Sequence, residues 1–223
     1  MNGVPILYKA VRPDGRSFWD GRTVWAVGEV TNHPLPMNVE RRKTRSADAY
    51  LSVSDSPTEC TGMQWPCRLL IVEPAGRSKP WQVGDLLPHK WAGAAWRVVE
   101  ERPAHEVFGP QGEQVVALLA RIPAMTAQEI RDTDAARGAA RGAAWDAARC
   151  AAWDAAWDAA RDAAWDAAWG VAWDATRCAA RCAAWDAVLG LFVRDLITPE
   201  HYATLTGPLA SVIGPIHPDD ATR

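Results

Sequence analysis

The chain has 223 residues, and its 24 Lys+Arg and 27 Asp+Glu give a formal net charge of −3. This near balance argues against a globally basic nucleic-acid binder and against an acidic solvating tail. The 13 Trp, against 3 Tyr and 3 Phe, exclude a disordered chain of low hydrophobicity.

Residues 1–9 lack a basic stretch followed by an apolar core, and the five cysteines are an odd number without Cys-x-x-Cys spacing. We therefore expect reduced thiols, a cytoplasmic location and no metal site. Asp and Arg interrupt the Ala/Trp-rich region throughout, so no run of about eighteen apolar residues occurs and no membrane partner is expected.

Residues 1–123 are predicted to form a β-rich domain that binds a ligand or a partner. Short runs rich in Val, Ile, Leu, Trp and Tyr are bounded by Gly, Pro, Asp or Asn, which is typical of strands. A short helix is expected within residues 56–62. The predicted strands cover residues 5–11, 23–27, 50–54, 68–72, 96–100 and 114–122.

A basic run interrupts this domain before the strand predicted at residues 50–54. Its members are candidate ligand-binding residues, because clustered guanidinium and ammonium groups bind phosphate. A solvated loop is the alternative interpretation. The residues are Arg41, Arg42, Lys43 and Arg45.

Residues 124–194 are predicted to be helical. Thr126 and Glu129 have the spacing of a capping box, in which each side chain accepts a hydrogen bond from the other's backbone N–H. Residues 135–187 then repeat every four positions as Ala-Ala-(Trp or Arg)-(Asp, Gly or Cys), and the Trp/Arg position recurs thirteen times from 137 to 185.

The four-residue period has a defined consequence on an α-helix. Four residues advance about 400°, so each Trp/Arg position lies about 40° round from the last, and ten steps carry the tryptophans around the whole helix. We therefore predict either a hairpin or bundle with a break at Gly170 or a coiled region with right-handed twist, and a homo-oligomer with the tryptophans in its core or interface. They are Trp145, Trp153, Trp157, Trp165, Trp169, Trp173 and Trp185.

Residues 195–223 leave the repeat and are predicted to form a short C-terminal helix and a tail. Thr198, Pro199 and Glu200 have the order of an N-cap, a first-turn proline and an acidic first turn. The helix is expected to run through Leu205 and to end at the Gly-Pro pair of residues 207–208.

Three short motifs distantly resemble ADP-ribosyltransferases. They are Lys9 on the first predicted strand, Ser-x-Ser at residues 52–54 and Gln-x-Glu at residues 111–113. The resemblance implies an NAD pocket shaped by Ser52, in which Lys9 or Arg12 holds phosphate and Glu113 stabilises the ribosyl cation. Lys9 departs from the Arg or His usual at that place.

Other stretches resemble an uncharacterised domain common in actinobacteriophages and their hosts. They are Leu-Tyr-Lys-Ala-Val at residues 7–11, Trp-Ala-Val-Gly-Glu at 25–29 and Cys-Arg-Leu-Leu-Ile-Val-Glu at 67–73. Members often carry an Ala-rich repeat downstream, and the endings at residues 194–198 and 217–220 are similar to those of such phage proteins. The resemblance implies a bacteriophage or actinobacterial origin and brings no established catalytic residue.

The sequence contains no phosphate-binding glycine loop, zinc-protease motif or nucleophile elbow. We therefore predict an α+β protein that acts without catalysis and without a cofactor, as a phage accessory protein in the infected bacterial cell. It would engage a host protein or sequester a small ligand, with the helical region as its oligomerisation scaffold. An NAD-dependent ADP-ribosyltransferase and a virion structural component are the alternatives.

Overall fold

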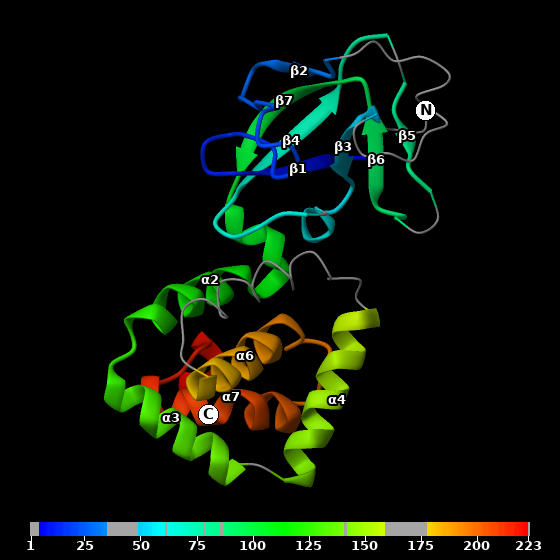
Figure 1. Cartoon of the computed structure of the whole chain (residues 1–223). Helices are drawn as coiled ribbons and strands as arrows, with labels where there is room; N and C mark the ends of the chain where they lie inside the picture. Colours follow the sequence, from blue (N-terminus) through cyan, green and yellow to red (C-terminus); the bar gives the residue numbers. More distant parts are fainter. Residues whose placement is uncertain are drawn as a thin grey trace. The chain divides into compact units, whose positions relative to one another are not determined.

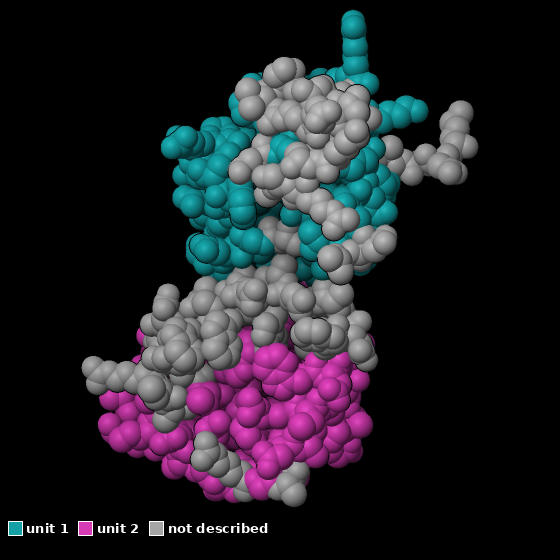
Figure 2. Space-filling view, turned by 45° about the vertical axis from the view of Figure 1, so that its right-hand side comes forward, with its two compact units in different colours: residues 1–107 teal, residues 108–223 magenta. Residues whose placement is uncertain are grey.

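The computed structural model describes residues 5–34, 49–60, 62–77, 79–84, 87–140, 142–158 and 178–222. The chain divides into two compact units, residues 1–107 and residues 108–223 (Figures 1 and 2). The first unit carries an antiparallel sheet and the second carries α-helices, which confirms the predicted α+β class.

The described part of the first unit forms one antiparallel sheet in the order β2-β7-β4-β1-β3-β6-β5 (Figure 1). A short 3-10 helix, η2 (Pro57–Glu59), follows β3. The strands are β1 (Leu7–Val11), β2 (Val30–Asn32), β3 (Leu51–Ser54), β4 (Arg68–Pro74), β5 (Trp81–Gln82), β6 (Lys90–Gly93) and β7 (Ala95–Arg102).

Four predicted strands are confirmed, those at residues 5–11, 50–54, 68–72 and 96–100. The strand predicted at residues 23–27 is wrong, because this segment contributes only an isolated bridge between Arg16 and Val24. Its central residue, Trp25, instead packs into the core as part of a loop.

The core of the sheet follows the alternation of its strands, since every second residue faces the same side. Apolar side chains from β1, β3, β4 and β7 meet on that side, and Trp25 joins them from its loop. The cluster consists of Leu7, Val11, Trp25, Leu51, Val53, Leu70, Val72, Trp96 and Val98, each at most 8% exposed.

The described helices of the second unit pack around its C-terminal helix. The helices are α2 (Gly112–Arg121), α3 (Ala127–Ala140), α4 (Ala143–Asp158), α6 (Cys178–Phe192) and α7 (Pro199–Ile213), with 3-10 segments η3 (Ala104–Gln111), η4 (Ile122–Ala124) and η5 (Pro218–Thr222). Helix α7 contacts α3, α4 and α6, so the region is a bundle, which is one of the arrangements predicted for it (Figure 1).

The strand predicted at residues 114–122 is wrong, because these residues belong to α2 and η4. Val115, Leu118, Leu119 and Ile122 are buried, and their spacing of three, four and seven residues is helical rather than alternating. Helix α2 packs against α6. The division between the units therefore falls after Val107, and not after residue 123 where the composition changes.

The C-terminal helix also differs from its prediction. Thr198 caps α7 as expected, since its Oγ1 accepts from the backbone N–H of His201 at 3.2 Å. The helix nevertheless continues through Pro208 to Ile213. Proline removes the N–H that would bond the carbonyl four residues earlier, and the complete burial of Leu205 and Leu209 against the bundle offsets that loss.

The helical region is interrupted within the repeat, at a position that was not predicted from the sequence. Helix α3 ends at Ala140 and α4 begins at Ala143, with the carbonyl of Gly142 accepting from the N–H groups of Trp145 and Asp146. Gly170, the predicted break, lies outside the described residues. Among the helices that the structure describes, none combines the length and apolar character needed to cross a bilayer.

Candidate ligand-binding site

The sheet of the first unit separates between two neighbouring strands, β1 and β3. Strand β1 pairs with β4 along its whole length and β3 pairs with β6 along its whole length, but β1 and β3 pair only at Tyr8 and Ser54. Continued antiparallel register would place Ala10 opposite Ser52. The strands have parted there, so backbone groups of both residues need other partners.

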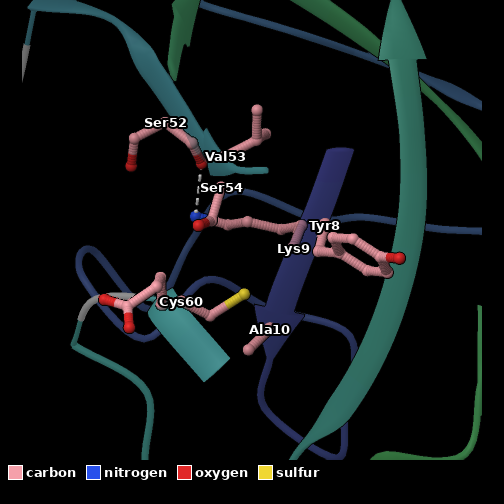
Figure 3. Close-up of a pocket in the computed structure, with 8 residues that line it drawn as sticks. Tyr8, Lys9, Ala10, Ser52, Val53, Ser54 and Cys60 are labelled. Carbon is pink, nitrogen blue, oxygen red and sulfur yellow. Dashed lines mark hydrogen bonds between the residues drawn. The ribbon is translucent and has the colours of Figure 1, made fainter. Parts of the chain in front are cut away.

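Two side chains supply those partners (Figure 3). The ammonium Nζ of Lys9 donates to the carbonyl oxygen of Ser52 at 2.9 Å. The backbone N–H of Ala10 donates to the sulfur of Cys60, which points toward β1. The opening in the sheet is therefore lined by side-chain functional groups instead of being closed by strand pairing.

Lys9 is a charge in an apolar setting. It lies on the same face of β1 as Leu7 and Val11, which are both fully buried. Its Nζ lies 5.2 Å from the ring centroid of Trp25, and the Trp25 indole is fixed by a 3.0 Å hydrogen bond from Nε1 to Ser17 Oγ. A lysine at this position faces an aromatic ring and a carbonyl, which are weak replacements for water.

Desolvation by burial lowers the pKa of Lys9 from 10.5 to about 8. The carboxylate of Asp20 opposes this shift, and the nearby ammonium of Lys90 adds to it. Among the described residues, no carboxylate forms an ion pair with Lys9. Lys90, which is partly exposed, also has its pKa lowered by desolvation.

Both lysines line the same cleft, which has a volume of about 490 Å³. That volume lies within the range of small-molecule sites. The wall combines the ammonium groups of Lys9 and Lys90 with the rings of Phe18, Trp19, Trp25 and Tyr50, and the carboxylate of Asp20 also lines it. Trp19 is 72% exposed, so its indole presents open apolar area at the rim of the cleft.

Two buried thiols lie near the cleft without adding nucleophilic chemistry. Cys60 and Cys67 are both free. Burial raises the pKa of Cys60 to about 11 and that of Cys67 to about 12. Both therefore stay protonated near neutral pH, and the thiolate that reacts as a nucleophile is scarce.

The three residues of the ADP-ribosyltransferase resemblance fall in different places. Lys9 and Ser52 are brought together, although Ser52 contributes its carbonyl to that contact. Glu113 lies in the first turn of α2 and belongs to the other compact unit. The expectation of a carboxylate in a turn before a strand is thus wrong, because residues 114–122 are helical.

The basic run predicted to bind phosphate lies outside the described residues. Three of the seven repeat tryptophans, Trp165, Trp169 and Trp173, also lie outside the described residues. The backbone of Trp157 belongs to the last turn of α4, but its side chain is not among those described. Of the other three, Trp145 and Trp185 are 5% and 6% exposed, and Trp153 is 39% exposed.

Trp145 shows what the repeat builds when its helices pack. Its ring centroid lies 5.1 Å from the guanidinium of Arg137 and 4.8 Å from that of Arg149. Arg137 Nε donates to Asp186 Oδ2 at 3.3 Å, and Arg149 Nε lies 3.5 Å from Asp186 Oδ1. The carboxylate is 3% exposed. Repeat positions from α3, α4 and α6 thus bring two arginines to one buried carboxylate and one indole in the bundle.

A second polar group in the first unit joins β6 to the end of β3. The carboxylate of Asp55 accepts from Trp91 Nε1 at 2.9 Å and lies 2.8 Å from His89 Nδ1, while the backbone N–H of Asp55 donates to the His89 carbonyl at 3.0 Å. This arrangement ties two strands together. In the described ranges, no three His, Cys, Asp or Glu side chains are placed to hold a metal ion.

Sequence reasoning missed Trp25 and Lys90 as site residues, and it placed Lys9 only by resemblance. A signal was present for Lys9, because a single charge between Leu7 and Val11 breaks the apolar face of a strand. No comparable signal marks Lys90, whose position depends on how β6 joins the sheet.

Comparison with protein-family models, curated proteins and solved structures found no match to this chain.

Proposed function

We propose that the first unit is a binding module for a small organic anion with a planar ring, held in the cleft between β1 and β3. The observation that supports this most directly is the pair of desolvated lysines, Lys9 and Lys90, in one aromatic-lined cleft. This refines the ligand-sequestering role expected from the sequence.

The chemistry of the cleft selects both parts of such a ligand. An anionic group offsets the desolvation of the two ammonium groups, which neutral acceptors do only weakly. A planar ring packs on the aromatic wall that Trp19 and Tyr50 help to form. A neutral ring would add no counter-charge for the two lysines beyond the Asp20 carboxylate, and a compact inorganic anion would leave the aromatic surface uncovered.

Calorimetric titration with two matched pairs of compounds tests the proposal. AMP and pyridoxine 5′-phosphate are expected to bind at least about tenfold more tightly than adenosine and pyridoxine, because only the phosphates meet the lysines. Lys9→Met and Lys90→Met are expected to remove this preference. Lys79→Met is the matched control, since Lys79 is exposed and away from the cleft.

The proposal is wrong if neither phosphate binds more tightly than its neutral partner. It is also wrong if Lys9→Met and Lys90→Met, shown to be folded by their circular dichroism, bind the phosphates as the unmodified chain does.

For the whole chain, we propose a phage accessory protein in the host cytoplasm whose helical unit mediates self-association. Trp153, which is 39% exposed on α4, is a candidate contact residue. Sedimentation equilibrium is expected to give more than one chain per particle at micromolar concentration. A monomer throughout that range contradicts the oligomer.

NAD chemistry is a second candidate, favoured by the contact between Lys9 and Ser52. NAD carries planar rings and an anionic pyrophosphate, so it shares both features of this ligand class. Incubation with labelled NAD tests for transfer: covalent label that Glu113→Gln abolishes would establish the transferase, and the absence of label would leave binding as the activity of the cleft.

A further inference from the structure

We propose that Lys9 is a reactive amine that forms an imine with an aldehyde-bearing ligand of the cleft. This inference rests on the proposed function, since the ligand is the planar anion described above with a carbonyl group added. Both lysines attract the anionic group as ammonium ions, and Lys9 in its neutral form also meets the carbonyl carbon.

The position of Lys9 supports this assignment. Its nitrogen is held at the cleft by the Ser52 carbonyl at 2.9 Å and by the face of Trp25 at 5.2 Å. Neither contact consumes the nitrogen lone pair once the amine is neutral, because the amine still has an N–H to donate to the carbonyl. An ion-paired lysine would instead be kept protonated by its carboxylate.

The environment also provides the neutral amine that the reaction needs. Desolvation lowers the pKa of Lys9 to about 8, so a useful fraction is unprotonated near neutral pH, as in other lysines activated by an apolar pocket and a second cation. Asp20, one of the charged groups that face Lys9, is ionised in the folded chain. Burial alone would raise the pKa of Asp20, but hydrogen bonds from Thr23 and Arg22 lower it below its usual value, so Asp20 stays a carboxylate.

The reaction balances without an oxidant or a reductant. The lone pair of Lys9 Nζ attacks the aldehyde carbon, the carbonyl π electrons move to oxygen, and one proton passes from nitrogen to that oxygen. The resulting carbinolamine then loses its hydroxyl together with the second nitrogen proton. The products are a C=N bond to Lys9 and one molecule of water.

Pyridoxal 5′-phosphate is the probe, because it is a planar phosphate that carries an aldehyde. Equimolar probe is added to the full chain, the imine is followed by its absorbance, borohydride reduces it, and peptide mapping locates the adduct. We expect at least tenfold more adduct on Lys9 than on exposed Lys79. The rate of imine formation is expected to rise with pH through a midpoint near 8.

Variants separate this proposal from the binding proposal. Lys9→Arg keeps the cation but cannot form an imine, so it should bind pyridoxine 5′-phosphate and give no adduct at position 9. Lys90→Met should weaken binding yet still give the Lys9 adduct at saturating probe. Lys79→Met should change neither measurement.

Two results overturn the imine. One is adduct spread evenly over the lysines, and the other is an unchanged total adduct in Lys9→Arg. If pyridoxine 5′-phosphate binds while the imine is absent, only this inference fails. If pyridoxine 5′-phosphate does not bind, the proposed function fails as well.

Discussion

The two units of this protein bury cationic side chains in opposite ways. In the helical unit, Arg137 and Arg149 both contact the carboxylate of Asp186, and both lie near the ring of Trp145. In the sheet unit, Lys9 faces a carbonyl and the ring of Trp25, and its ammonium lines a cleft. All three cations lie near an indole, but only the two arginines have a buried counter-charge.

This difference separates packing from binding. A buried charge that meets its counter-charge has its desolvation offset inside the fold, so it needs no ligand. A desolvated charge whose direct contacts are a carbonyl and an aromatic ring keeps part of that penalty, which an anionic ligand can relieve. The same residue class therefore indicates a structural contact in one unit and a candidate site in the other.

The largest effect is expected at the indole of Trp145 in the helical unit. Trp145→Ala removes a large buried ring between two guanidinium groups, and it is expected to lower the free energy of unfolding by about 3–5 kcal/mol. Trp153→Ala changes the same repeat position on the same helix, but its ring is 39% exposed, so a loss near 1 kcal/mol or less is expected. Urea denaturation measures both, and equal losses would contradict a role for burial.

The counter-charge comes next. Asp186→Asn leaves Arg137 and Arg149 without a carboxylate, and it is expected to cost about 3 kcal/mol. Asp154→Asn is the matched control, because Asp154 occupies the same repeat position and is exposed. Its expected effect is within about 0.5 kcal/mol. If Asp186→Asn is as mild as the control, the arginines do not depend on that carboxylate.

Lys9, which forms no ion pair among the described residues, predicts a pH dependence of stability. The pKa of Lys9 is lowered on folding from 10.5 to about 8, so the unfolded chain binds more protons between these values and the folded state gains stability as pH rises. Relative to Lys9→Met, the unmodified chain should therefore gain about 1–3 kcal/mol between pH 8 and 10.5.

Denaturation of both chains across that range measures the difference. The groups facing Lys9, which are Cys60, Lys90 and Asp20, are present in both chains, so their own titration largely cancels. A difference that stays constant with pH would show that Lys9 is not desolvated on folding.

The smallest expected change in the free energy of unfolding concerns a helix cap, which stabilises the helical unit locally and not through tertiary packing. Thr126→Ala removes the acceptor for the Glu129 N–H, a hydrogen bond of 3.2 Å, and it is expected to cost about 1 kcal/mol. Thr204→Ala is the control, since the Thr204 hydroxyl only donates to the Glu200 carbonyl of its own helix and should change stability little. Equal effects would show that the cap contributes nothing of its own.

Local patterns predicted the local structure well. The capping box at Thr126 and Glu129 forms with both hydrogen bonds, and four strands lie where apolar runs were bounded by turn residues. The errors arose where tertiary packing decided the outcome. Helix α7 continues through Pro208 because buried Leu205 and Leu209 hold it in the bundle. The spacing of Val115, Leu118 and Ile122 in the sequence already indicates a helix, so the strand predicted at residues 114–122 was an avoidable error.

By itself, the sequence determined the α+β class, the capped helix starts and the four-residue spacing that brings tryptophan, arginine and aspartate into the bundle. These depend on neighbours within a few residues, so short patterns carry them. Only the tertiary structure decided that β1 and β3 part beside Lys9 and that Lys90 joins it at one cleft. Strand order and the loss of water from a charged group depend on residues far apart in the chain, which no local pattern specifies.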